Sequence, residues 1–414
     1  MLSTLRSDLK LLLKYTQLFP LCFAVFVSML GFGLVMPLLP IYARSFGATG
    51  VQLGLLTTSF AISRAVTTYP GGWLADRSGR KKPIVVGLFM YSVVMVLYGF
   101  TEDVNQLIFL RALQGVASGI VWPIINTMIV DITSPEDRSK ALGLYETMWF
   151  LGMAVGPGLG GMLAGAFTIA VPFFVCGVLA FLSMFLVILT VKETMPFVKT
   201  PNGLVVSEDA FPRVSVKGLK QFMPYPIVFL SLCIARFTTA FSSSLIQPVL
   251  SVYANEVLGI PTMEVGLLFT VMGIVTLITT LPMGVIADNV GRKRAFISGD
   301  LLYALSALLI IFSRGFWPLL VVMILQGFGR AIINPSLTAM FSGVVSAPKR
   351  GEAMGIFNVF QNLGLIVGSA AGGFLYEFSS SEMPFITCFL VGLIGVLVIL
   401  STVSEPNIRQ PLGS

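Results

Sequence analysis

The chain carries one short polar sequence twice: GWLADRSGRKK at residues 72–82 and GVIADNVGRKR at residues 284–294. The two copies are 212 residues apart, and the same offset relates further identical positions: Gln114 and Gln326, Pro123 and Pro335, Arg138 and Arg350, Gly156 and Gly368. A constant offset without a gap indicates an internal repeat. The sequence therefore predicts two structurally related halves.

Long apolar runs flank both copies. The 414 residues are 56% hydrophobic and 11% charged, and their mean hydropathy is +0.91. About 20 apolar residues let a helix cross a hydrocarbon core of about 30 Å, and a backbone in lipid must satisfy its own hydrogen bonds. We therefore expect an all-α integral membrane protein with twelve transmembrane helices, at residues 18–42, 51–73, 83–101, 106–130, 139–163, 168–190, 224–254, 262–286, 294–312, 316–341, 352–374 and 384–403.

One long polar stretch divides the spans into two groups of six. It contains several prolines and charges of both signs, which is typical of a linker. The predicted domains are a six-helix bundle at 1–190, a cytoplasmic linker at 191–223 and a second six-helix bundle at 224–414. Pseudo-symmetric bundles of this kind occur in transporters whose substrate site lies between the repeats.

The basic residues indicate the orientation in the membrane. Of the 26 lysines and arginines, 20 fall in segments that are cytoplasmic if the amino terminus is inside, two fall in outer loops and four lie within spans. This bias predicts a multi-pass protein of the cytoplasmic (inner) membrane with both termini in the cytoplasm. The net charge of +7 does not indicate nucleic-acid binding, because the charges are divided among short loops.

Residues that usually hold metals or cofactors are few. The chain has no histidine, and its four cysteines fall inside apolar runs, where a thiol behaves as a small hydrophobic group. We expect no disulfide, no metal site and no cofactor. The expected partners are the lipid bilayer, protons and a lipophilic or lipid-like small molecule, and the chain is expected to be a monomer.

Four motifs resemble those of the major facilitator superfamily, and together with the repeat they cover the chain from the first span to the last. The loop at 72–82 matches the loop between the second and third helices of that family. RALQG at 111–115 is similar to its embedded-arginine motif. GMAVGPGLGG at 152–161 resembles its antiporter motif, and LGFGLVMPLLP at 30–40 resembles the first-helix motif of twelve-spanner drug:proton antiporters. The resemblance implies the major facilitator fold and export by alternating access.

The loop at 72–82 has two interpretations. Its bases satisfy the positive-inside rule, and its glycines suit a tight turn. The resemblance implies more: Asp76 caps a helix across the domain interface, in one charge cluster with Arg80 and Asp131, and holds the cytoplasmic side shut. Gly343 stands where the second copy would have Asp131, so its cluster should be weaker and gating asymmetric. The candidate gating residues are Asp76, Arg77, Arg80, Asp131, Arg138, Asp288 and Arg292.

Glycines recur at every fourth position of the fifth predicted span, at Gly152, Gly156 and Gly160. This spacing lets two helix backbones approach, and Pro157 permits a bend. We expect these residues, with Gly161, to pack tightly against the opposite half and to seal or open the transport path.

Polar residues form a stripe on the fourth predicted span, beginning at Arg111. Such a stripe is costly in lipid and should face a central cavity, unless Arg111 extends outward from a helix end. Aromatic residues on neighbouring spans suit an apolar, planar substrate, although each could also serve helix packing. The candidate cavity residues are Phe32, Gln114, Ser118, Trp122, Asn126, Tyr145, Trp149, Phe237, Phe241, Asn358 and Gln361.

Away from the span ends, four arginines and two acids lie within the spans: Arg64, Arg111, Arg236, Arg330, Glu146 and Asp300. None has a charged counterpart at the 212 offset, so we expect each to serve function or local pairing. Glu146 is expected to carry the coupling proton close to Arg64 and Arg111, or else to form a permanent ion pair with one of them. For Asp300, a structural ion pair, for example with Arg330, is favoured over a transport role.

These features predict a secondary active transporter, a proton-coupled antiporter that exports lipophilic small molecules or drugs. The excess of arginine within the spans leaves a second possibility, a transporter of organic anions or lipid-like amphiphiles. A membrane-embedded enzyme or receptor is a third, which no catalytic constellation in the sequence supports.

Overall fold

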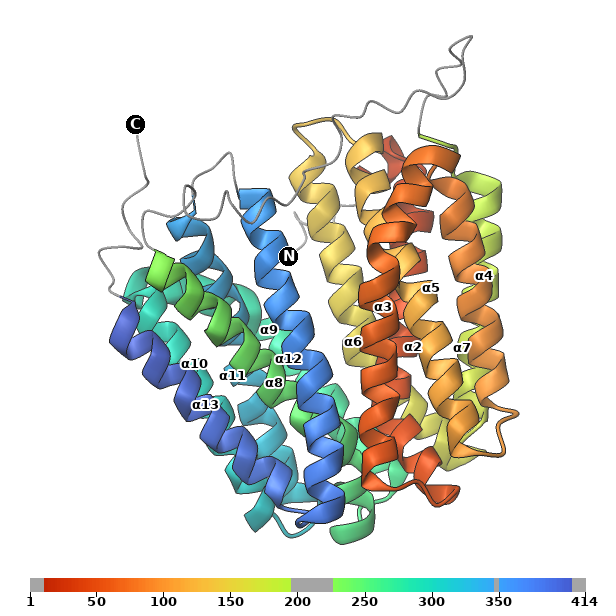
Figure 1. Ribbon diagram of the computed structural model, residues 1–414. Coiled ribbons are helices and arrows are strands. Elements are labelled where there is room, and N and C mark those ends of the chain that lie inside the picture. The colour runs from red at the N-terminus through yellow and green to blue at the C-terminus, as the bar shows by residue number, and fades with distance from the viewer. Residues whose placement is uncertain (1–10, 195–225, 346–349, 404–414) are drawn as a thin grey trace. The chain divides into compact units, whose positions relative to one another are not determined.

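The computed structural model describes residues 11–194, 226–345 and 350–403. Within these ranges the chain forms long α-helices joined by short loops (Figure 1). Each predicted span coincides with one helix. The helices are α2 (Leu18–Ser45), α3 (Gly50–Ser78), α4 (Lys81–Tyr98), α5 (Val104–Ile132), α6 (Arg138–Ala166), α7 (Val171–Thr190), α8 (Pro226–Val252), α9 (Thr262–Val290), α10 (Arg292–Leu309), α11 (Phe316–Val344), α12 (Arg350–Phe378) and α13 (Met383–Thr402).

By length and composition, eleven of the helices in the described part of the chain could cross a membrane. The remaining long helix is α3, which has 29 residues and is therefore long enough. It is more polar than the others because Arg64 lies among serines and threonines in its middle. A helix with such a face is stable in a membrane when the polar side chains meet other protein groups.

The described residues fall into two compact units. Unit 1 comprises those within 1–48, 59–207 and 261–270, and unit 2 comprises those within 49–58, 208–260 and 271–414. Each unit therefore contains the first turns of one helix from the other half of the sequence, α9 in unit 1 and α3 in unit 2. The predicted boundaries at 190 and 224 remain a prediction, and most of the predicted linker lies outside the described residues.

In unit 1 the central contact is that of α2 with α6. A Cβ added at Gly152 would lie 2.6 Å from the carbonyl oxygen of Phe26, and one added at Gly160 would lie 2.8 Å from the side chain of Leu34. The backbones of α2 and α6 can approach this closely because these positions carry no side chain. Gly152, Gly156 and Gly160 thus pack on a helix of their own half of the sequence, whereas the expected contact with the opposite half is made by Gly161.

A second face of α6 meets the first turns of α9, which also belong to unit 1. A Cβ on Gly161 would lie 3.0 Å from the Cα of Gly266, and a Cβ on Gly158 would lie 2.7 Å from the Thr270 hydroxyl oxygen. Because small residues occupy both faces, α6 is held closely on two sides.

Unit 2 repeats this plan 212 residues later. Its central contact is that of α8 with α12, and Gly364, Gly368 and Gly372 of α12 face the α8 backbone. These glycines are the repeat partners of Gly152, Gly156 and Gly160. The sequence repeat is therefore also a repeat of helix contacts.

The close packing of α6 on α2 generates a stability prediction. A Cβ at Gly156 would lie 2.9 Å from the nitrogen of Leu34 and 3.1 Å from the carbonyl carbon of Gly33, which are backbone atoms that cannot rotate away. Gly156→Ala should therefore lower the free energy of unfolding by about 1–3 kcal/mol, as overpacking usually does. Thermal unfolding of the purified protein in detergent measures the change.

Gly143→Ala is the matched control in the same helix, because nothing lies within 4 Å of its added Cβ. Alanine is the better helix former, so this variant should be as stable as the wild type or slightly more stable. Equal melting temperatures for the two variants would contradict the packing argument.

Candidate functional site

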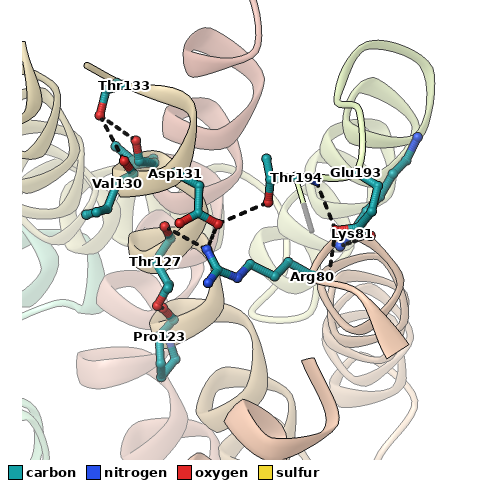
Figure 2. A network of polar contacts seen from close by, with 10 residues as sticks. Arg80, Lys81, Pro123, Thr127, Val130, Asp131, Thr133, Glu193 and Thr194 are labelled. Carbon is teal, nitrogen blue, oxygen red and sulfur yellow. Dashed lines mark hydrogen bonds and ion pairs between the residues drawn. The ribbon is translucent and has the colours of Figure 1, made fainter. Parts of the chain in front are cut away.

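The loop between α3 and α4 is fastened by a residue from far along the chain. The carboxylate of Glu193, just after α7, accepts hydrogen bonds from the backbone N–H groups of Arg80 at 2.9 Å and Lys81 at 3.0 Å (Figure 2). These groups open α4, and a carboxylate at a helix amino terminus is stabilising. Gly79 has φ +87°, and a Cβ there would lie 2.5 Å from Glu193 Oε2, so a side chain at this position would be strained.

Sequence reasoning missed Glu193. The available signal was its position directly after the last span of the first half, with Glu405 at the 212 offset. Glu405 lies outside the described residues.

Arg80 forms the predicted ion pair with Asp131 at the end of α5 (Figure 2). Its guanidinium also donates to the carbonyl of Thr127 at 3.1 Å, and the hydroxyl of Thr194 donates to Asp131 at 3.2 Å. Burial lowers the pKa of Arg80, and the charges of Asp76 and Glu193 act in the opposite direction. The loop, the end of α5 and the segment after α7 are thus joined by one polar network.

The other predicted gating residues of this half form no hydrogen bond or ion pair with that network among the described residues, although the charge of Asp76 acts on Arg80. Asp76 is exposed, and its carboxylate hydrogen-bonds to no residue that the structure describes. Arg77 lies over the ring of Trp73, with its guanidinium carbon 4.1 Å from the ring centroid. Arg138 is exposed at the first position of α6. The roles assigned to these three residues remain predictions.

In the second copy of the loop, at residues 284–294, the arginine makes the same contact with a backbone carbonyl but forms its ion pair with a different acid. Arg292 donates to the carbonyl of Ala339 at 3.1 Å, as Arg80 does to Thr127 in the first copy. Because Gly343 has no carboxylate, the Nε of Arg292 pairs instead with Asp288 at 2.8 Å. Asp288 is mostly exposed and lies near the end of α9, just before the turn into α10. The expected difference between the two charge clusters is present, whereas asymmetric gating remains a prediction.

Inside unit 1, Arg111 is almost fully buried, with 3% of its surface exposed. It donates to the Gln114 side-chain oxygen at 2.5 Å, and the hydroxyl of Tyr98 donates to the same oxygen at 3.0 Å. The Gln114 amide reaches the Tyr91 hydroxyl at 3.4 Å. Arg111 therefore does not extend outward from a helix end. Its hydrogen bonds go to a neutral amide, with no ion pair to any described carboxylate.

Aromatic rings surround Arg64 and Arg111, the two arginines of unit 1 that lie within the predicted spans. The guanidinium of Arg111 lies 4.5 Å from the Phe60 ring centroid, and that of Arg64 lies 5.7 Å from the Trp122 ring centroid. The cluster, which we call the aromatic cluster, consists of Phe32, Phe60, Trp122, Tyr145 and Trp149. Four of its members were predicted, and Phe60 was missed because it is an ordinary apolar residue on a span.

The polar residues of α5 continue this arrangement. Ser118 and Trp122 are buried, and their hydroxyl and indole N–H have no hydrogen-bond partner among the described residues. Asn126 is half-buried and within hydrogen-bonding reach of Tyr145. The polar residues of the predicted stripe thus lie with the aromatic cluster in unit 1.

Glu146 follows Tyr145 on α6, but its side chain is exposed on unit 1. Tyr145, and not Glu146, turns into the core of unit 1, and the role expected of Glu146 remains a prediction. Within unit 1 no ion pair joins Glu146 to Arg64 or Arg111, so a permanent pair does not hold it in this structure.

In unit 2, Arg236 on α8 is surrounded by the same kinds of group as Arg111 in unit 1, although the two are not repeat partners. Its guanidinium donates to the side-chain oxygens of Asn334 at 3.0 Å and Gln361 at 2.8 Å, and lies 5.1 Å from the Phe357 ring centroid. Phe237 and Phe241 stack with their ring centroids 5.9 Å apart. Asn358, the repeat partner of Glu146, is exposed and lies outside this group.

Metal chemistry has no evident site in the part of the chain that the structure describes. It contains no group of three or more cysteine or acidic residues that could hold an ion. The four cysteines are free and buried.

Curated relatives align with nearly the whole chain. Multidrug resistance protein 2 of Bacillus subtilis (strain 168) is 29% identical over 378 residues, which are 90% of this chain and 91% of the relative. Quinolone resistance protein NorA of Staphylococcus aureus (strain N315) is 28% identical over 385 residues, which are 93% of this chain and 96% of the relative.

Solved structures share the fold at low sequence identity. A bacterial homologue of the human lysosomal transporter Spinster, inward-facing and occupied, has a TM-score of 0.77 at 15% identity, covering 95% of this chain and 98% of that chain. The human organic anion transporter MFSD10 (TETRAN) has a TM-score of 0.62 at 17% identity, covering 92% and 98%. At these identities the likeness shows the fold alone.

The Major Facilitator Superfamily itself matches this sequence twice, at residues 21–235 and at residues 232–414. The two matches follow the two repeat halves, and the predicted all-α fold with its resemblance to this family is confirmed. Members of the family are transporters and not enzymes, which excludes the alternative of a membrane-embedded enzyme. The chain is a multi-pass membrane transporter and belongs to the Major Facilitator Superfamily.

Proposed function

We propose that this transporter is a proton-coupled antiporter that exports lipophilic small molecules or drugs by alternating access. The aromatic cluster of unit 1 carries the substrate part of the proposal. Rings that meet at angles, such as Trp122 and Trp149 with centroids 4.8 Å apart, offer faces and edges to a planar apolar molecule. The names of the drug-resistance relatives support the same substrate class.

Glu146 carries the proton part of the proposal. It is a carboxylate within a membrane-spanning helix, it has no ion-pair partner among the described residues, and its repeat partner Asn358 cannot titrate. A carboxyl group free of a fixed counter-charge can gain and lose a proton during a transport cycle. Arg64 and Arg111 are proposed to supply the positive field close to it.

A specific observation favours a second candidate, a transporter of organic anions or lipid-like amphiphiles. Arg111 and Arg236 each donate to neutral side-chain oxygens, and neither forms an ion pair with a described carboxylate. Their positive charges are therefore not neutralised within the units. An anionic group on the substrate would be attracted to them.

Gating is proposed to depend on the first charge cluster. Arg80 and Asp131 hold the end of α5 to the loop between α3 and α4, and Asp76 is proposed to close the cytoplasmic side. We further propose that both termini are cytoplasmic and that the chain acts as a monomer in the cytoplasmic membrane. The bias of lysine and arginine toward one set of loops supports the orientation.

Replacing Glu146 tests proton coupling. In proteoliposomes, Glu146→Gln should abolish substrate accumulation driven by a pH gradient while downhill exchange persists, because an amide cannot carry a proton. Glu102→Gln, which changes an exposed carboxylate outside the helices, is the control and should transport normally. If the Glu146→Gln variant still accumulated substrate against its gradient, another group would have to carry the coupling proton.

Replacing one ring tests the substrate class. Trp149→Leu should weaken binding of a planar lipophilic dye roughly two- to tenfold, since an aromatic contact contributes about 0.5–1.5 kcal/mol beyond its buried area. Phe150→Leu, the next residue and 40% exposed, is the matched control and should bind like the wild type. Fluorescence titration with a neutral and an anionic dye measures both.

The same titration of Arg111→Gln tests the second candidate. If this variant lost binding of the anionic dye and kept binding of the neutral dye, the second candidate would be favoured.

The two charge clusters should respond differently to loss of their acids. Asp131→Asn should lower the free energy of unfolding by about 1–3 kcal/mol, because it weakens charge-assisted bonds to Arg80 and Thr194. Asp288→Asn breaks a largely exposed pair across the turn between α9 and α10 and should cost about 0.5 kcal/mol or less. Thermal unfolding and transport are measured together for both variants. Equal losses in the two variants would contradict the proposed asymmetry.

A further inference from the structure

One carboxyl group of unit 2 is deeply buried and has no part in the proposed function. Asp300 lies in α10, which packs against α11 and α13. It is 2% exposed, and its Oδ2 has no hydrogen-bond partner among the described residues. A buried acid without a partner is rare in a membrane protein and indicates a function.

The ion pair between Asp300 and Arg330 that the sequence favoured is absent from the described residues. Arg330 on α11 instead reaches the hydroxyl of Tyr303, one turn after Asp300 on α10, at 3.5 Å. Its guanidinium lies 5.6 Å from the Tyr303 ring centroid. The Arg330 guanidinium therefore contacts Tyr303, and it does not neutralise the Asp300 carboxyl group.

The other groups around Asp300 are neutral. A Cβ on Gly395 of α13 would lie 3.2 Å from Asp300 Oδ2 and 2.7 Å from the hydroxyl oxygen of Thr238 on α8. The titratable groups that act on this region are Cys388 of α13, Tyr303 of α10 and Arg330 of α11. Among the described residues, α8 contributes no ionisable group here, only hydroxyls.

No neighbouring donor among the described residues stabilises a carboxylate at this position. Asp300 Oδ2 has no hydrogen-bond partner among the described residues. The nearby hydroxyl of Thr238 donates its proton to the carbonyl of Ala235 at 3.1 Å instead. An isolated charge in this apolar setting would cost more than taking up a proton.

We propose that Asp300 is a proton-binding site that holds its proton at neutral pH in this conformation. The counter-charge that would displace the proton is Arg330, if α11 moved so that its guanidinium left Tyr303 and reached the carboxyl group. The inference does not depend on the role proposed for Glu146.

Infrared difference spectroscopy of the full chain in liposomes tests the protonation directly. The carbonyl stretch of a protonated carboxyl group should be present at neutral pH in the wild type and in Glu146→Gln, and absent in Asp300→Asn. Loss of the band in Glu146→Gln with retention in Asp300→Asn would overturn the inference and leave the function proposed for Glu146 standing. Absence of the band from the wild type would also overturn it.

Thermal unfolding over a range of pH gives an independent readout. A folded state that retains a proton which the unfolded chain releases becomes less stable as pH rises, so the wild-type melting temperature should fall toward alkaline pH. Asp300→Asn cannot titrate and should lack that component, with a melting temperature at neutral pH close to that of the wild type. A sodium-specific rise in the wild-type melting temperature that Asp300→Asn abolishes would overturn the proton assignment in favour of a cation site.

A double-mutant cycle separates a proton site from an ion pair. If Asp300 is neutral, the effects of Asp300→Asn and Arg330→Gln on the melting temperature should add. A large drop in each single variant with partial recovery in the double variant would show that the two residues are paired, and would overturn the proposal.

Discussion

The close contact of helix backbones in each half is the constraint on which the other features depend. In lipid the hydrophobic effect does not drive helices together, so α2 and α6 must gain their attraction from contact over short distances. Glycines at 152, 156 and 160 make that contact possible, and their partners on α12 do the same against α8. The approach of α6 to α2 brings Trp149 and Tyr145 to the rings of α5 and places Phe32 beside them. A single side chain on that glycine face would separate the helices that build the aromatic cluster.

The repeat supplies the scaffold, and residues without a repeat partner supply the differences between the halves. Arg80 and Arg292 contact equivalent carbonyl oxygens, and Lys81 and Lys293 reach the equivalent carbonyls of Ile188 and Leu400. Asp131 has no acidic counterpart, so Arg80 pairs with an acid at the end of α5, whereas Arg292 pairs with Asp288, just across the turn between α9 and α10. The membrane-embedded charges are likewise unique to one half. A duplicated fold can therefore bind protons or substrate differently on its two sides without changing its helix contacts.

Three arginines within the spans are held by neutral groups in the described residues. Arg111 is buried with an amide and aromatic rings, Arg236 with two amides and a ring, and Arg330 with a tyrosine. Guanidinium groups tolerate such surroundings because they are weakly hydrated and interact with the faces of rings. Among the described residues, Glu146 and Asp300 form no ion pair, and a carboxyl group without a fixed counter-charge can exchange a proton. The same arrangement leaves positive charge available to an anionic substrate, so the arginine variants bear on both proposals.

The sequence by itself determined the helices, the repeat and the family, because hydropathy and the 212-residue offset are properties of the chain and do not depend on packing. It also predicted the pair of Arg80 with Asp131 and most of the aromatic cluster, since those residues stand out chemically on their helices. Tertiary structure alone decided which face each side chain occupies. Glu193 was found only because folding brings the end of α7 to the start of α4, and Glu146 is exposed because α6 turns Tyr145 inward. Arg330 meets Tyr303 and leaves Asp300 alone for the same reason: partners between helices are set by rotation and distance, which no linear pattern records.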